Sequence, residues 1–302
     1  WIEPLSADFA GATIWELPPS TQGIAVLQML QLLDESGIER FDHNSADYLH
    51  WLIEAKKLVY EDRARYYADP ERVAVPTTSL VARDYARRRA REIDPERAST
   101  APVAGVVENP ADTVYLTAVD EERNAVSLIQ SIYRGFGSGN VPTGLGFALQ
   151  NRGTLFSLDP SHPNRLEPRK RPFHTIIPGF VTVSGAPRFS FGVMGGDMQP
   201  QGQLQVLLNA LLHGMDAQAA GDAPRFRHDG SSTPTGDRAA GSGTVLLESA
   251  VPEATARELR GRGHRVVRAG HGFGGYQGIW IESPGGLVGG TERRKDGCAL
   301  GL

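Results

Sequence analysis

The stretch ENPADTVYLTAVDEERNAVSLIQSIY, residues 108–133, decides the fold of this protein. It opens with a polar, proline-containing segment that ends at Asp112. From Thr113 onward, polar and apolar residues alternate over TVYLTAVD and again over NAVSLIQSIY, on either side of the charged turn DEER. A period of two residues on both sides of a polar turn is typical of a β-hairpin. The sequence therefore predicts a core hairpin that begins at Thr113.

The segment before this hairpin, residues 94–112, reads as a loop of unusual length. Its sequence, DPERASTAPVAGVVENPAD, has three prolines, several small residues and no long apolar period. Such a loop is uncommon inside a compact domain unless it is functional or is cut. A threonine hydroxyl needs a neighbouring base to act as a nucleophile, and a cut before Thr113 would supply an α-amine with a pKa of about 8. The residues therefore allow a nucleophilic Thr113, while an ordinary strand-opening threonine stays open at this point.

Three helices are predicted before the loop. Residues 23–37, GIAVLQMLQLLDESG, are apolar on most turns and end at a glycine, which indicates a largely buried helix. A second helix is expected over residues 45–69, where apolar side chains recur at i, i+3 and i+4, a serine or asparagine can cap the start and a proline follows the end. A charged third helix is expected over residues 79–93. Residues 1–93 are thus expected to be helical.

The part of the chain after the hairpin has blocks of strands with helices beside them. Residues 173–195, FHTIIPGFVTVSGAPRFSFGVMG, read as two strands around the turn SGAP, and residues 202–215 read as a helix. A short helix DAQAAGD, the strand TVLLE, a helix over residues 251–263 and the strands HRVVRA, GIWIE and GLVGG follow. This order favours a layered α+β sandwich over a β-α-β-α alternation.

The bulk composition limits the class of protein. The 302 residues are 40% hydrophobic and 22% charged, an ordinary globular composition that suits one large domain or two small ones. A net charge of -4 predicts no nucleic-acid partner, and no apolar run approaches the roughly 18 residues of a membrane span. Cys298 is the single cysteine, which excludes an internal disulfide and favours a reducing, cytoplasmic compartment. The chain opens at Trp1 without a targeting segment, so we expect a processed or truncated piece.

Several familiar catalytic signatures do not occur in the sequence. The glycine-rich loops GFGSG and GFGGYQG lack the context of a dinucleotide-binding turn, and tight turns explain them better. The eight histidines show no HExxH and no paired metal-ligand spacing, and no serine lies in GxSxG, so we expect no metal and no cofactor. A strand that ends at Gly195 and Gly196 just before a helix is a candidate oxyanion site, although an ordinary strand-to-helix turn explains it as well.

Taken in chain order, these segments resemble the γ-glutamyltranspeptidase family of N-terminal nucleophile (Ntn) hydrolases. The matching stretches cover nearly the whole chain: LPPSTQGIAVLQMLQLL, KLVYEDRARYYADP, ADTVYLTAVDEERNAVSLIQS, GFGSG, PRKRPFHTIIP, VMGGDMQPQGQLQVLLN and DAPRFRH. FHTIIP and MGGDMQPQG look more like the transpeptidase-like branch. That branch includes acylases of β-lactam side chains, hydrolases of small dicarboxylate amides and cleavage enzymes of antibiotic pathways.

The resemblance implies a four-layer αββα sandwich that cleaves itself between Asp112 and Thr113. Residues 1–112 would then be the C-terminal part of a large subunit and end in the cleavage loop. Residues 113–302 would be the small subunit that carries the nucleophile. The two pieces would share one αββα domain, as a heterodimer that can dimerise further.

The resemblance also implies roles for four residues around the nucleophile. Thr113 would be the nucleophile and, through its amine, the base. Ser131 falls where the family has a hydroxyl residue beside the nucleophile. Gly195 and Gly196 match the oxyanion-hole glycines of the family.

The predicted substrate pocket departs from that of a classical γ-glutamyl transferase. Tyr133 replaces the asparagine that helps to hold a γ-glutamyl group, and His174 and Thr175 replace the serine pair that contacts its α-carboxylate. Arg152 falls near the residues that hold its α-amino group, where a second cation is unfavourable. Arg134 and Arg152 would instead suit an anionic acyl group, because a guanidinium can bind a carboxylate through two hydrogen bonds.

We therefore predict an autoprocessing Ntn hydrolase or acyltransferase that cleaves an amide of a small anionic acyl substrate through an acyl-enzyme. It would need no cofactor and have no nucleic-acid or membrane partner. One alternative is a C–C bond hydrolase that uses the same threonine in an antibiotic pathway. Another is an inactive, unprocessed relative that serves as a scaffold or binding subunit.

Overall fold

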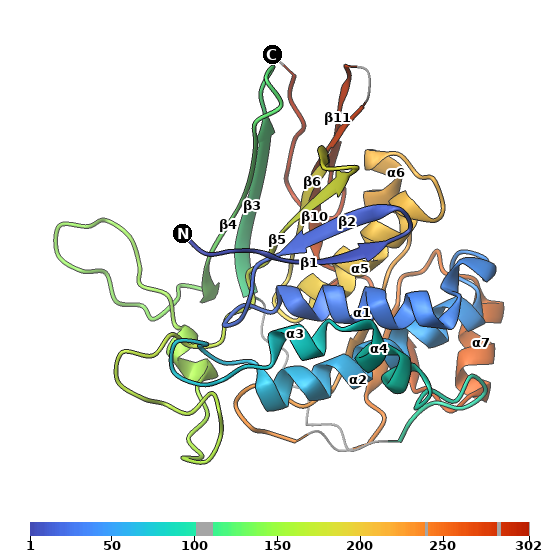
Figure 1. Cartoon of the computed structure of the whole chain (residues 1–302), viewed down its shortest axis with the longest axis horizontal. Coiled ribbons are helices and arrows are strands. Elements are labelled where there is room, and N and C mark those ends of the chain that lie inside the picture. Colours follow the sequence, from blue (N-terminus) through green and yellow to red (C-terminus); the bar gives the residue numbers. More distant parts are fainter. Residues whose placement is uncertain (101–110, 239–240, 283–284, 302) are drawn as a thin grey trace.

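The computed structural model describes residues 1–100, 111–238, 241–282 and 285–301, and these fold around three β-sheets with helices packed beside them (Figure 1). The sheets have six, two and three strands. Most of the predicted cleavage loop, residues 101–110, lies outside the described residues. The mixture of helices and sheets confirms the predicted α+β class.

The chain opens with a hairpin that the sequence analysis does not predict. β1 (Leu5–Phe9) and β2 (Ala12–Glu16) pair antiparallel, with Ala10 and Gly11 between them at φ values of 50° and 78°. The expected helical character of residues 1–93 is therefore wrong for this segment. Strands of five residues offer too few alternations to be distinguished from irregular chain by their period.

Two of the predicted helices are confirmed. α1 (Gly23–Ser36) is buried on almost all sides and ends at Gly37, which is left-handed with a φ of 66°. α2 (Ala46–Tyr66) begins after Ser45, whose side chain accepts a hydrogen bond from the amide of Tyr48. Among the described residues, no helix is both long and apolar enough to span a lipid bilayer.

The third predicted helix is wrong in its extent. The structure has α3 (Thr77–Leu80) followed by α4 (Arg83–Ala90), with a break at Val81 and Ala82 between them. α4 buries only Ala86. Tertiary packing of an apolar face supplies most of the stability of a helix. Because α4 buries so little surface, it does not join α3 in one longer helix.

The predicted core hairpin is confirmed, although it begins earlier than Thr113. β3 (Ala111–Val119) and β4 (Ala125–Arg134) pair antiparallel, and their register shifts between Asp112 and Thr113. The apolar side chains of the outer face are at least half exposed: Val114, Leu116, Val126 and Leu128. The described residues therefore leave one face of this hairpin uncovered.

The largest sheet carries the other strands predicted around the turn SGAP. β5 (Pro178–Val183) pairs with β2 and with β6 (Ala186–Met194). β10 (Gly275–Ile281) and β11 (Leu287–Thr291) complete an antiparallel sheet in the order β1-β2-β5-β6-β10-β11. The segment FHTII, residues 173–177, precedes β5 and is not a strand, contrary to prediction.

The backbone of FHTII bonds partners outside the sheet, which explains why this segment is not a strand. The amide of His174 donates to the carbonyl of Ser20 over 3.0 Å. The amide of Ile177 donates to Oε1 of Gln199 over 3.2 Å. Loop and side-chain acceptors thus replace a strand neighbour.

The C-terminal third adds the remaining helices and a three-stranded sheet. α5 (Met198–Leu211) begins earlier than predicted, and α6 (Ala217–Asp222) follows it. The small sheet consists of β7 (Phe226–Asp229), β8 (Thr244–Leu247) and β9 (Val266–Arg268), and α7 (Glu253–Gly261) connects the parallel strands β8 and β9. Two short 3₁₀ turns are η1 (Ile38–Arg40) and η2 (Arg152–Leu155).

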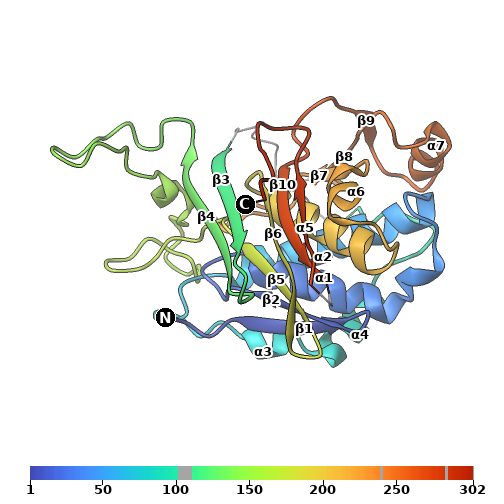
Figure 2. The same cartoon turned by 90° about the horizontal axis from the view of Figure 1, so that it is seen from above.

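Strand β6 shows how the layers stack, because its neighbouring residues face opposite sides. Gly192 lies against the ring of Tyr115 in β3, and Val193 lies against Gly202 in α5. The hairpin and the helices therefore cover opposite faces of the six-stranded sheet (Figure 2). Of the expected αββα layers, the described residues form a helical layer, the six-stranded sheet and the two-stranded β3–β4 layer.

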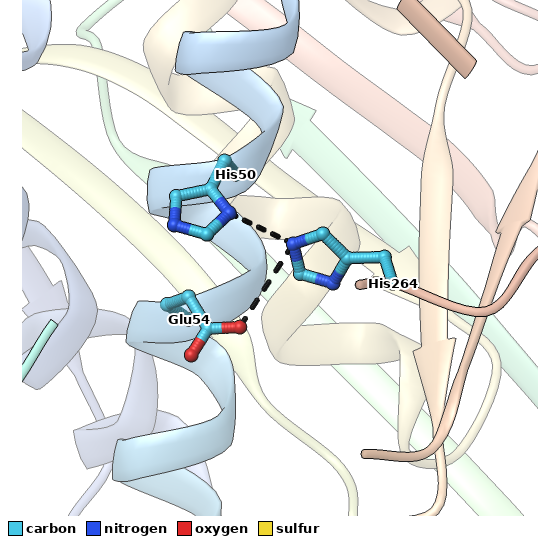
Figure 3. Close-up of side chains that lie close together, drawn as sticks. All are labelled: His50, Glu54 and His264. Atoms are coloured by element: carbon cyan, nitrogen blue, oxygen red, sulfur yellow. Dashed lines mark hydrogen bonds and ion pairs between the residues drawn. The ribbon is translucent and has the colours of Figure 1, made fainter. Parts of the chain in front are cut away.

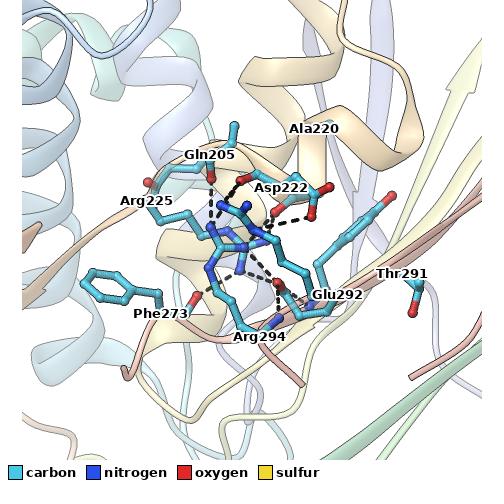
Figure 4. Close-up of polar contacts among 12 residues, drawn as sticks. Gln205, Ala220, Asp222, Arg225, Phe273, Thr291, Glu292 and Arg294 are labelled. Carbon is cyan, nitrogen blue, oxygen red and sulfur yellow. Dashed lines mark hydrogen bonds and ion pairs between the residues drawn. The ribbon is translucent and has the colours of Figure 1, made fainter. Parts of the chain in front are cut away.

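A buried ion-pair network ties the small sheet to the edge of the large one (Figure 4). Arg225, just before β7, lies 2.9 Å from Glu292, just after β11, and both side chains are fully buried. Arg294 bonds Glu292 over 2.7 Å and Glu248, which follows β8, over 2.5 Å. Ion pairs thus join segments from three parts of the chain.

Candidate active site

Thr113 lies at a β-bulge between β3 and β4. It pairs with Ser131, whereas the preceding pair joins Asp112 to Tyr133, so that Ile132 is the extra residue. The hydroxyl of Thr113 donates to Oγ of Ser131 over 3.1 Å, and the same oxygen accepts from the amide of Tyr133 over 2.9 Å. Bulges re-aim side chains and are frequent beside active sites.

A groove of about 2570 Å³ runs past the Thr113 side chain and past the turn between β6 and α5. Gly195 and Gly196 form this turn, with φ values of 130° and 59° that glycine adopts readily. Their amides donate no hydrogen bond to any residue in the described part of the chain. Two free donors and a hydroxyl on one groove are the parts that acyl transfer needs.

Two arginines lie beside the ring of Tyr133. Arg134 lines the groove, and its guanidinium carbon is 5.1 Å from the ring centroid. Arg152 is 5.0 Å from the same centroid but only 4% exposed. Nη1 of Arg152 donates to Oγ1 of Thr175 over 3.0 Å, whereas Nη2 is buried without a partner. Burial lowers the pKa of Arg152 to about 10.

His174 lies beside this buried guanidinium. Burial, with the nearby charges of Arg152 and Arg171, lowers the pKa of His174 to about 4, so the imidazole is neutral at pH 7. Its Nδ1 atom is buried without a hydrogen-bond partner. Among the described residues, Arg152 forms no ion pair with a carboxylate. The cluster therefore lacks the anion that would balance it.

The predicted site residues fall into two groups. Thr113, Tyr133, Arg134, Gly195 and Gly196 line the groove, and Ser131 is bonded to Thr113 behind it. Arg152, His174 and Thr175 form a separate cluster next to the Tyr133 ring and do not line the groove wall. Their roles stay predictions.

The structure adds groove residues that sequence reasoning did not assign. Asp197 follows the two glycines and is ion-paired with Arg63 of α2. Lys56, also in α2, lies 2.7 Å from Oγ of Ser231 and 3.1 Å from Nδ1 of His228. Burial and the charge of Arg63 lower the pKa of Lys56 to about 7. Lys56 and Arg63 lie beside and within the motif KLVYEDR, but the helical periodicity of that motif does not indicate a functional role for either.

A second cluster, away from the groove, brings His50, Glu54 and His264 together (Figure 3). Nε2 of His50 is 2.8 Å from the carbonyl of Asp94, which only accepts, so Nδ1 of His50 accepts from Nε2 of His264. The i, i+4 spacing of His50 and Glu54 on one helix is the signal that could have predicted the contact.

These three side chains have the chemistry of zinc ligands, but their partners argue against a metal. Nζ of Lys57 is 2.7 Å from Oε1 of Glu54, and the two imidazoles already bond each other. A divalent cation would meet the buried ammonium of Lys57 at close range, which is unfavourable. We interpret the cluster as a structural network that joins α2 to the segment before β9.

Comparison with known proteins places this arrangement in context. The family model described as gamma-glutamyltranspeptidase matches residues 1–302. The chain is 35% identical to a glutathione hydrolase-like proenzyme of Bacillus subtilis, over 100% of this chain and 56% of that protein. It is also 35% identical to an oxamate amidohydrolase proenzyme of Klebsiella pneumoniae, over 99% of this chain and 55% of that protein.

A solved structure is similar over almost the whole chain. The cephalosporin acylase from Bacillus halodurans matches with a TM-score of 0.86 and 42% identity, over 98% of this chain and 52% of that one. The chain thus spans about half the length of the curated relatives it matches.

Proposed function

This chain belongs to the gamma-glutamyltranspeptidase family, and from that membership we propose that it carries the catalytic part of an autoprocessing Ntn hydrolase with Thr113 as its nucleophile. One observation supports the proposal above all: Thr113 lines the same groove as Gly195 and Gly196, whose amides donate to no described residue. Nucleophile and oxyanion donors on one groove form the minimal machinery for amide cleavage.

The proposed reaction begins with self-cleavage, in which water hydrolyses the Asp112–Thr113 peptide bond and leaves a carboxylate on Asp112 and a free α-amine on Thr113. The amine takes the hydroxyl proton as Oγ1 forms a bond to the carbonyl carbon of the substrate amide. The C–N bond then breaks, and the leaving amine receives the proton. Water, or an acceptor amine, releases the acyl group from the threonine ester. Gly195 and Gly196 would stabilise the oxyanion in both steps, and Ser131 would orient the hydroxyl.

The acyl part of the substrate is proposed to carry a carboxylate. Among the described residues, one nitrogen of the buried Arg152 guanidinium has no partner, and the Tyr133 ring that contacts it also contacts Arg134, which lines the groove. A buried guanidinium is most stable beside a carboxylate that it can bind through two hydrogen bonds. The oxamate amidohydrolase among the relatives is named for an amide with an anionic acyl group. A γ-glutamyl group, with its α-ammonium, suits this cluster less well.

We further propose that the mature protein consists of two pieces, residues up to 112 and residues 113–302. Two curated relatives are named proenzymes, which supports a processed precursor. The β3–β4 hairpin would then carry the new N-terminus at the bulge where Thr113 already lies.

Intact mass measurement with N-terminal sequencing of the full-length purified protein tests the proposal. We expect two fragments, one of which begins Thr113-Val114-Tyr115. Thr113→Ala should abolish both self-cleavage and amide turnover. Thr117→Ala is the same change four residues further along β3, and this variant should be cleaved normally. An uncut chain that is stable for days would overturn the proposal and favour the scaffold alternative.

A further inference from the structure

The turn that carries the oxyanion donors is held by side chains from other elements. From these contacts we propose that Arg63 of α2 is a positioning residue that holds the Gly195-Gly196-Asp197 turn in its productive geometry and neutralises Asp197. The inference rests on the proposed function, because a positioning role requires that the two glycine amides bind an oxyanion.

One nitrogen atom of Arg63 bonds both Asp197 in the turn and Gln22, which itself bonds the turn. Its Nη1 donates to Oδ1 of Asp197 over 2.6 Å and to Oε1 of Gln22 over 2.8 Å. Nε2 of Gln22 in turn donates to the carbonyls of Gly196 and Thr175, each over 2.9 Å. A single guanidinium thus fixes the side chain after the glycines directly and the carbonyl of Gly196 through Gln22.

The neighbouring carbonyls are restrained as well. The hydroxyl of Tyr60 donates to the carbonyl of Asp197 over 2.6 Å, and the guanidinium of Arg63 lies over the Tyr60 ring at 3.8 Å. The carbonyl of Gly195 accepts from the amide of Met198 over 3.0 Å, in the first turn of α5. A peptide group is planar, and its carbonyl and amide point in opposite directions, so this bond orients the amide of Gly196 away from the helix.

The turn needs such restraint because of its composition. Gly195 and Gly196 have φ values of 130° and 59°, and a glycine pair has many other conformations within reach. A donor that is misplaced by about 1 Å can cost on the order of 10²-fold in rate. These hydrogen bonds therefore restrain the two residues whose conformational freedom would otherwise lower the reaction rate most.

Charge gives Arg63 a second role. The side chain of Asp197 is 59% exposed and lines the groove immediately after the oxyanion donors. An unpaired carboxylate there would oppose the negative charge that develops in the transition state. Arg63 is 1% exposed and lies against this carboxylate, so the pair presents little net charge to the oxyanion.

Steady-state and burst kinetics of the full-length protein test the role, with an N-acyl p-nitroanilide whose acyl chain ends in a carboxylate. Arg63→Met should lower kcat on the order of 10²-fold while KM changes little, because the turn and not the acyl pocket is affected. Arg63→Lys should keep part of the activity, and Arg63→Met with Asp197→Asn should recover part of the loss. Gln22→Leu, which removes no charge, should also lower kcat.

Arg89→Met is the matched control. Arg89 of α4 pairs with Asp62 and Glu92, away from the turn, so its loss should affect thermal stability and leave kcat unchanged. If Arg63→Met does not fold, Arg63→Lys and Gln22→Leu decide the matter. Folded variants with wild-type kcat, or with a change in KM alone, would overturn the inference. A wild-type protein without an acyl adduct on Thr113 by mass would overturn the proposed function itself, and this inference with it.

Discussion

Arg152 combines deep burial with an incomplete set of partners. Thr175 binds one of its nitrogens, the Tyr133 ring lies beside it, and the neighbouring imidazole of His174 is neutral at pH 7. A buried cation without a counter-ion costs stability, and proteins tolerate that cost mainly where a ligand supplies the missing charge. In the proposed function, Arg152 would therefore link the stability of the fold to the choice of substrate.

We expect Arg152→Gln to raise KM for the anionic p-nitroanilide by about 10- to 100-fold, the equivalent of one charged hydrogen bond. The effect on a neutral acyl p-nitroanilide should be several-fold smaller. The free energy of unfolding, measured in urea, should not decrease, because the variant removes an unpaired buried charge. Arg87→Gln on α4, which is exposed and far from the groove, controls for charge loss alone. Equal losses on both substrates would contradict an acyl-carboxylate role.

At the level of secondary-structure elements, the position of the β3–β4 hairpin depends on one glycine. A Cβ atom at Gly192 of β6 would overlap the ring of Tyr115, which is 5% exposed and hydrogen-bonded through its hydroxyl to Ser127. The absence of a side chain at Gly192 thus lets the hairpin approach the sheet. Because Thr113 lies two residues before Tyr115, the same contact helps to set the distance from Thr113 to the glycine turn at the end of β6.

Gly192→Ala should therefore destabilise the protein by about 1–3 kcal/mol through overpacking, and should lower kcat because the hairpin is displaced. Urea unfolding and kcat of the processed protein measure the two effects. Gly261→Ala at the end of α7 has no atom within 4 Å of its added Cβ and should change stability by less than about 1 kcal/mol, in the stabilising direction. A Gly192→Ala protein as stable and active as wild type would show that the hairpin adapts freely.

For the whole molecule, the network around Glu292 joins the small sheet to the large one. Glu292 accepts from Arg225, from Arg294 and from the amide of Tyr276 over 2.9 Å. Arg225 and Glu292 are fully buried, so neither charge can be solvated if the other is lost. Removing one partner should therefore cost much more stability than replacing both together.

Glu292→Gln should destabilise the fold by about 3–5 kcal/mol, since it leaves the Arg225 charge buried without a carboxylate. Glu253→Gln is the matched control, because Glu253 is 60% exposed and bonds Arg260 and Arg268 at the surface, where ion pairs contribute about 1 kcal/mol or less. Thermal unfolding of both variants at one pH gives the comparison. Similar losses in the two proteins would refute the role of the buried network.

The sequence by itself determined the features that local patterns encode. Alternation over residues 113–133 marked the hairpin that Thr113 opens, and apolar periodicity marked α1 and α2. Ordered motifs along the chain pointed to the family that the comparisons confirm. The sequence did not predict the short strands β1 and β2 or the break between α3 and α4, because elements of four or five residues carry too little periodic signal.

Only the tertiary structure decided which distant groups meet. Arg63 and Asp197 are 134 positions apart, and Gln22 and Gly196 are 174 positions apart, yet they share one hydrogen-bonded network. That no described carboxylate pairs with Arg152 could not be predicted from the sequence either. The physical reason is that a period of 2 or 3.6 residues reports which face of an element is buried, whereas the partner on that face depends on how the layers stack.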